Sequence, residues 1–101
     1  MTLHLVVHQA AAAAGSEAER AERAALAEAV WEVADSHWAA GPDALLISTD
    51  LTPAYLTRHF RSGLARRGFP KAGMLIIVPV TAPAAFTGMP ADVAQWVEET
   101  R

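Results

Sequence analysis

The chain has 101 residues, of which 52% are hydrophobic and 19% charged, and it contains no cysteine. This length predicts a single domain over residues 1–101, and so apolar a composition excludes a disordered chain. The lack of cysteine excludes disulfide frameworks and thiolate metal sites. No apolar run is long enough to span a membrane, and the first residues lack the basic flank of a signal peptide, so we expect a cytoplasmic protein.

Charge is distributed unevenly along the chain, whose formal net charge is −3. Residues 1–50 hold eight acidic and two basic residues, whereas residues 51–91 hold five basic residues and no acid. A net acidic balance argues against a general nucleic-acid binder, whose footprint is usually basic. The pattern instead predicts one basic patch facing an acidic remainder, and such asymmetry also suits self-association.

The first half predicts a strand, a helix and a turn. Residues 3–8 alternate as in a strand, which places His4 and His8 on one face, and residues 9–15 predict the strand end and a loop. Ser16 begins a helix with a capping box. An apolar stripe extends this helix to about residue 35, with its charged residues, Glu22 included, pointing mostly away from the core.

The next segments leave one topological alternative open. Residues 37–40 form either the last helical turn or a strand that pairs with residues 44–49 across a turn at residues 41–43. His37 continues the apolar stripe and is expected at the edge of the core. Trp31 and Trp96 are also expected in the core, whereas Trp38, beside the turn, is expected at an interface.

The second half predicts a helix, a strand and a final helix. Thr52 and Pro53 open the first of these helices, which has a buried stripe at 56, 60 and 64 and ends at Gly68. Residues 73–80 show no polar alternation, which predicts an interior strand covered on both faces, with Pro79 at the strand end or on an edge. A loop over 81–89, which includes Pro83, precedes the last helix.

This order of elements predicts an α+β fold. We expect a ferredoxin-like β-α-β-β-α-β two-layer sandwich with an extra C-terminal helix.

The segment 46–52, with the sequence LISTDLT, ends an apolar strand and leads into an arginine-bearing helix. A fully apolar strand, a Gly-x-Pro element at 88–90 and a helix with Trp96 follow. Over residues 44–99 this pattern resembles the SinR-like proteins, which are similar to the small ferredoxin-like endoribonuclease subunit of the CRISPR adaptation complex. The resemblance implies the same fold and a homodimer joined through its sheets.

Nuclease members of that family carry a metal-binding aspartate at the end of the first strand. That place is occupied here by His8 and its neighbours, and no carboxylate lies between Met1 and Glu17. Because a hard divalent cation requires carboxylate oxygens, the resemblance does not imply a nuclease site in this chain. We predict no metal site and no cofactor.

Basic side chains on and after the second helix form the candidate surface for a nucleic acid or partner protein, since no acid in this part of the sequence neutralises them. They are Arg58, His59, Arg61, Arg66, Arg67 and Lys71. The alternative is a solvated helix face with no partner.

Four further residues are candidates for a pocket or an interface: His4, His8, Trp38 and Asp50. The two histidines lie about 13 Å apart along a strand, too far to share one ion, and the sequence shows no carboxylate near them. Their alternative role is structural, and that of Asp50 with Thr52 is helix capping.

The favoured function is a non-catalytic dimeric interaction module. The alternatives are a metal-dependent nuclease with a relocated carboxylate, at Asp43 or Asp50, and a small-molecule enzyme or binder with a pocket between sheet and helices.

Overall fold

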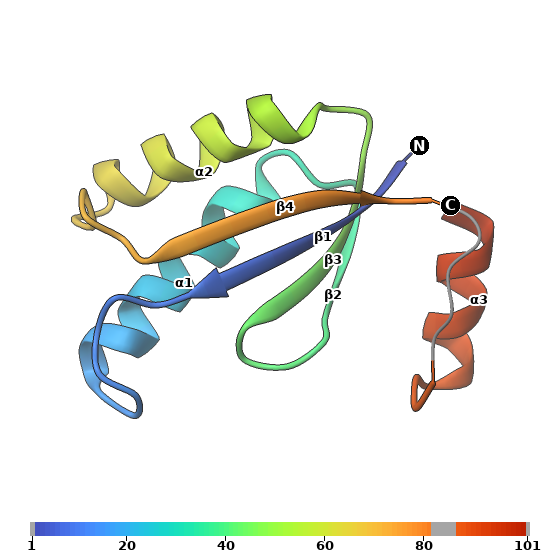
Figure 1. Cartoon of the computed structure of the whole chain (residues 1–101), viewed down its shortest axis with the longest axis horizontal. Coiled ribbons are helices and arrows are strands. Elements are labelled where there is room, and N and C mark those ends of the chain that lie inside the picture. The colour runs from blue at the N-terminus through green and yellow to red at the C-terminus, as the bar shows by residue number, and fades with distance from the viewer. Residues whose placement is uncertain (1, 82–86, 101) are drawn as a thin grey trace.

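A computed structural model describes residues 2–81 and 87–100 of the chain. Within this part the protein is an α+β structure with a four-stranded antiparallel sheet and three helices (Figure 1). The strands are β1 (Thr2–Gln9), β2 (Ser36–Ala39), β3 (Ala44–Thr49) and β4 (Met74–Val80). Their order in the sheet is β2-β3-β1-β4, so β1 and β3 are central and β2 and β4 are the edges.

The helices are α1 (Glu17–Trp31), α2 (Pro53–Arg66) and α3 (Ala91–Thr100). The predicted N-caps of the first two are confirmed. Ser16 Oγ accepts a hydrogen bond from the N–H of Glu19, and Thr52 Oγ1 accepts one from the N–H of Tyr55, each at 3.1 Å. None of the described helices combines the length and apolar character needed to cross a lipid bilayer.

Helices α1 and α2 pack on the same face of the sheet and form the main core with it. The predicted stripe of α2 is confirmed, since Leu56, Phe60 and Leu64 are fully buried. These side chains share one cluster with Val6 of β1 and Ile47 of β3. Burial of large apolar side chains is the main force that holds the helices to this face.

The opposite face of the sheet is covered only at one end, by α3. Leu3, Leu46 and Val97 form a second buried cluster there. Figure 1 shows α3 at the end of the sheet where β1 begins and β4 finishes. The rest of this surface, which we call the open face, has no helix of the described chain packed on it.

The helix predicted over 17–35 ends earlier, at Trp31, and the open alternative resolves as a hairpin of β2 and β3. Backbone pairing with β3 overrides the helical period after residue 31. As a result the core positions expected for two aromatic residues are wrong. Trp31 is 61% exposed, and its ring stacks on that of His37, which is itself exposed on β2.

The prediction that residues 73–80 form a strand covered on both faces is also wrong. β4 is an edge strand that pairs with β1 alone, and every second residue at its start is exposed. The edge position foreseen for Pro79 is confirmed, which is consistent with its missing N–H. Of the loop predicted over 81–89, residues 82–86, including Pro83, lie outside the described residues.

Candidate functional site

A deeply buried polar pair joins His8 of β1 to Glu22 of α1. Nε2 of His8 lies 2.5 Å from Oε2 of Glu22, and 4% and 2% of the two side chains are exposed. The sequence interpretation that Glu22 points away from the core, and that no carboxylate lies near His8, is therefore wrong. The spacing of residues in the sequence could have shown this position. Glu22 precedes Leu26 by four residues and Val30 by eight, which puts it on the apolar stripe of the helix.

Glu22 also accepts two backbone hydrogen bonds. The N–H of Ala11 donates to Oε1 at 3.1 Å, and the N–H of Gly73 donates to Oε2 at 3.2 Å. Burial raises the pKa of the carboxyl, but its hydrogen bonds with Gly73, His8 and Ala11 outweigh burial, so the pKa lies below its ordinary value. The carboxylate is thus ionised, and it ties the loop after β1 and the start of β4 to α1.

This arrangement depends on a glycine at position 73. A Cβ there would lie 1.7 Å from the carbonyl oxygen of Gln9 and 2.8 Å from the nitrogen of Ala11. Only glycine permits so close an approach of the two backbone segments. The same approach brings the N–H groups of Ala11 and Gly73 to one carboxylate.

A pocket of about 140 Å³ adjoins His8, between α1 and the turn that connects β2 to β3. Its walls are mostly apolar and include Val6, Leu26 and Leu45. Arg23 of α1 and Asp43 of the turn also line it. This pocket brings a buried histidine and an arginine to the walls of one small, partly open space.

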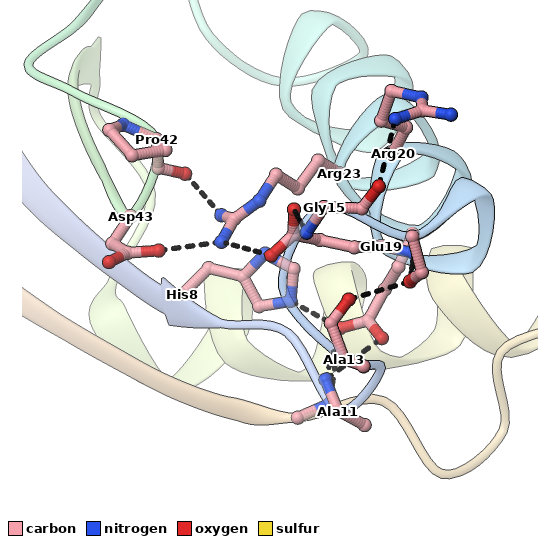
Figure 2. A network of polar contacts seen from close by, with 12 residues as sticks. His8, Ala11, Ala13, Gly15, Glu19, Arg20, Arg23, Pro42 and Asp43 are labelled. Carbon is pink, nitrogen blue, oxygen red and sulfur yellow. Dashed lines mark hydrogen bonds and ion pairs between the residues drawn. The ribbon is translucent and has the colours of Figure 1, made fainter.

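Arg23 connects α1 to the turn beside this pocket (Figure 2). Its guanidinium donates to the carbonyl oxygen of Pro42 and to Oδ1 of Asp43, the latter at 2.6 Å. Its Nη2 also lies 3.5 Å from Oε2 of Glu19, one turn earlier on α1. The turn is held a second time by the N–H of His8, which donates to the carbonyl oxygen of Asp43 at 2.8 Å.

The structure does not bring the other pocket candidates to His8. His4 does share the helix-covered face of β1, as predicted, and is buried, with no hydrogen-bond partner for Nδ1 among the described residues. Burial lowers its pKa, and a hydrogen bond with the backbone of Thr2 raises it by less. The ring is therefore neutral at ordinary pH and lies outside the lining of the 140 Å³ pocket.

Trp38 and Asp50 lie elsewhere. Trp38 is half-buried on the face that carries α3, where it borders a separate hollow of about 280 Å³ with Trp96. Asp50 is exposed after β3, and the N-cap residue of α2 is Thr52, whose side chain accepts from the N–H of Tyr55. The interface role predicted for Trp38 stays a prediction.

Acidic residues of α1 and its C-cap neutralise much of the predicted basic surface, contrary to the expectation drawn from sequence segments. Nε of Arg67 lies 2.8 Å from Oε2 of Glu28. Glu32 faces both His59, at 3.1 Å, and Arg66, at 3.8 Å. These pairs are partly exposed and contribute little stability, but they lower the positive potential of this surface.

The other three basic residues are exposed. Arg61 donates from Nη1 to the carbonyl oxygen of Ala72 at 3.1 Å, whereas Arg58 and Lys71 make no ion pair with the described residues. Beside Arg58 the rings of Tyr55 and His59 stack, with their centroids 6.1 Å apart, and a shallow hollow of about 420 Å³ lies over them.

The open face of the sheet is apolar and uncharged. Met74, Ile76 and Val78 are 46%, 45% and 42% exposed. The strand register sets Val7 beside Ile76 and Leu5 beside Val78, so these side chains form one continuous surface. Within the described strands, no ionisable residue points to this face.

Among the residues that the structure describes, no group of three or more His, Asp or Glu side chains is placed to hold a metal ion. The two carboxylates suggested as relocated ligands lie at opposite ends of β3, with Asp43 before it and Asp50 after it.

Comparisons with protein-family models, with curated proteins and with solved structures find no match to this chain.

Proposed function

We propose that this chain is a non-catalytic interaction module with a ferredoxin-like β-α-β-β-α-β fold, a C-terminal helix, and a homodimeric state. The strand order β2-β3-β1-β4, with α1 and α2 on one face, supports this fold. The similarity to SinR-like proteins remains a hypothesis that rests on the motifs of residues 44–99. A cytoplasmic location is likewise a prediction.

The observation that supports self-association is the open face. Exposed Met74, Ile76 and Val78 join half-buried Leu5 and Val7 in a contiguous apolar surface of the kind that marks interaction sites. A two-fold interface sets the same patch against itself, so it must be complementary to its own copy. An uncharged apolar surface meets this condition because it brings no like charges together.

The mass in solution tests the dimer. We expect sedimentation equilibrium to give twice the chain mass at micromolar concentration, and Ile76→Glu to give the monomer with unchanged circular dichroism. Ala24→Glu, which adds the same charge at an exposed site on α1, is the matched control and keeps the dimer. A wild-type monomer at high micromolar concentration would overturn the proposal.

A second proposed contact is with single-stranded nucleic acid through α2. The stacked rings of Tyr55 and His59 beside the exposed Arg58 favour it, because such proteins combine aromatic stacking with cationic side chains. The acids Glu28 and Glu32 weaken it, so we expect modest affinity with a shallow salt dependence.

Fluorescence anisotropy with a short single-stranded RNA at several salt concentrations tests this contact. Glu28→Gln with Glu32→Gln should raise the affinity and steepen the salt dependence, because the basic residues regain their full charge. Arg58→Glu should abolish binding. If neither change alters binding, or if wild-type binding is insensitive to salt, the nucleic-acid contact is wrong and an acidic partner protein remains.

The nuclease alternative has a direct test in RNA or DNA cleavage assayed with Mg²⁺ or Mn²⁺. Activity that disappears in Asp50→Ala or Asp43→Ala would favour it over the non-catalytic module.

A further inference from the structure

The pocket beside His8 differs from the other hollows in the groups that meet there. His8, whose ring is paired with Glu22, lines it from β1, and Arg23 lines it from α1. The other hollows have larger volumes, of about 280 to 420 Å³. Of these four hollows, this one has a buried histidine in its lining.

Glu22 determines which nitrogen of His8 is available to this pocket. The carboxylate is ionised and can only accept hydrogen bonds. Nε2 of His8 is therefore protonated, and its N–H donates a hydrogen bond to Oε2. The opposite edge of the ring, with Nδ1, is turned toward the side chain of Arg23 (Figure 2). Nδ1 is therefore the atom that His8 presents on the pocket side.

Arg23 already binds a carboxylate, that of Asp43, and this partner is replaceable. Asp43 is 63% exposed, whereas the Arg23 side chain is 23% exposed. Exposed ion pairs contribute little free energy, so a second carboxylate can take the place of Asp43 at small cost. Arginine is suited to such an exchange because its planar guanidinium matches a carboxylate in two parallel hydrogen bonds.

The size and lining of the pocket restrict what can enter. A volume of about 140 Å³ is close to that of the engineered apolar cavity, about 150 Å³, that holds benzene. Val6, Leu26 and Leu45 provide apolar walls that suit an alkyl chain rather than a second charged group.

We propose that this pocket binds the anion of a short-chain carboxylic acid with about six or fewer non-hydrogen atoms. Its carboxylate replaces that of Asp43 on Arg23, its alkyl chain contacts the apolar walls, and Nδ1 of His8 lies on its inner side. This site is on the helix-covered side of the sheet, so it is independent of the dimer proposed through the open face.

Propionate is the probe, and NMR of the whole chain is the measurement. At constant ionic strength we expect propionate to cause saturable shifts in the ring resonances of His8 and the Nε–H of Arg23, with a dissociation constant in the millimolar range. Propionamide, which has the same shape without the charge, should cause none. Butyrate, with about six non-hydrogen atoms, should still bind, whereas benzoate, with about nine, exceeds the pocket and should bind more weakly.

Two variants separate a ligand site from a merely structural connection between helix and turn. Asp43→Asn removes the competing carboxylate and should tighten propionate binding about fivefold. Arg23→Gln should weaken it on the order of tenfold. If the connection is only structural, propionate causes no saturable shift at His8 in the wild type or in Asp43→Asn, and the proposal is overturned.

Discussion

The two faces of the sheet are built from the same strands, yet they differ in the side chains that they carry and in what covers them. The helix-covered face buries two histidines and a carboxylate, and α1 supplies Glu22 to pair with one of them. The open face carries no ionisable residue and leaves Ile76 and Val78 partly in water. The buried His8 therefore has a charged partner that a helix provides, and apolar groups are exposed where no described element covers them.

The alternation of β1 produces this difference. Even-numbered residues, among them His4 and His8, face the helices, and odd-numbered residues such as Leu5 and Val7 face the open side. A shift of the register by one residue would exchange the two sets, which would expose the histidines and bury the uncharged surface under the helices. The pairing of His8 with Glu22 opposes such a shift.

The largest loss of stability is expected from a substitution at Gly73, where two backbone segments approach closely and bind Glu22. Gly73→Ala places a methyl group 1.7 Å from the carbonyl oxygen of Gln9, so the two segments must separate and Glu22 loses a donor. We expect the free energy of unfolding to fall by about 4 kcal/mol, as measured by urea denaturation.

The control for this change is Gly15→Ala. Gly15 has a positive φ of 80° but nothing within 4 Å of a Cβ, so only backbone strain opposes alanine, at a cost of about 1 kcal/mol. Equal losses for the two variants would contradict the close approach at Gly73.

Substitutions at two neighbouring isoleucines compare how much each face of the sheet contributes to the free energy of unfolding. Ile77 packs against the main core, whereas Ile76 is 45% exposed on the open face. In the monomer, we expect Ile77→Ala to lower the free energy of unfolding by about 2 to 3 kcal/mol and Ile76→Ala by less than about 1 kcal/mol. Denaturation at low protein concentration separates this effect from dimer formation, and a reversed order would mean that the faces are assigned incorrectly.

Glu22→Gln tests the buried carboxylate at nearly constant volume. It should cost about 2 kcal/mol at neutral pH, because hydrogen bonds to a charged group become bonds to an amide. The carboxyl pKa is lowered from 4.5 in the folded state, so its contribution is complete above pH 4.5 and is lost as the pH falls below that value. The stability gap between wild type and variant should narrow in that range, and a constant gap would contradict an ionised Glu22.

His4→Leu should have the smallest effect. Burial lowers the pKa of His4 from 6.5, so the folded state holds the neutral ring and loses stability as the pH falls below 6.5 and the unfolded chain binds a proton. Leucine cannot be protonated and leaves no buried nitrogen without a partner. We expect little difference at high pH and a gain of about 1 kcal/mol over wild type in mild acid. Parallel pH profiles would show that His4 does not titrate in this way.

Local rules predicted much of the fold. The caps at Ser16 and Thr52 and the spacing of Leu56, Phe60 and Leu64 depend on residues three or four positions apart, and the structure confirms them. The shared face of His4 and His8 follows from strand alternation in the same way. Less of the candidate site could be predicted. His8 was identified as a candidate, but its partner Glu22, 14 residues away, was placed on the wrong side of the helix.

The sequence alone therefore determined the kinds of most elements and, for β1 and α2, which residues share a face, because these follow from backbone geometry repeated over a few residues. Only the tertiary structure decided what covers each face. It put Glu22 against His8, set Glu28 and Glu32 against basic residues of α2 and its C-cap, and left β4 at an edge. Such contacts join segments far apart in the chain, and their free energy arises only when the whole set of elements packs together.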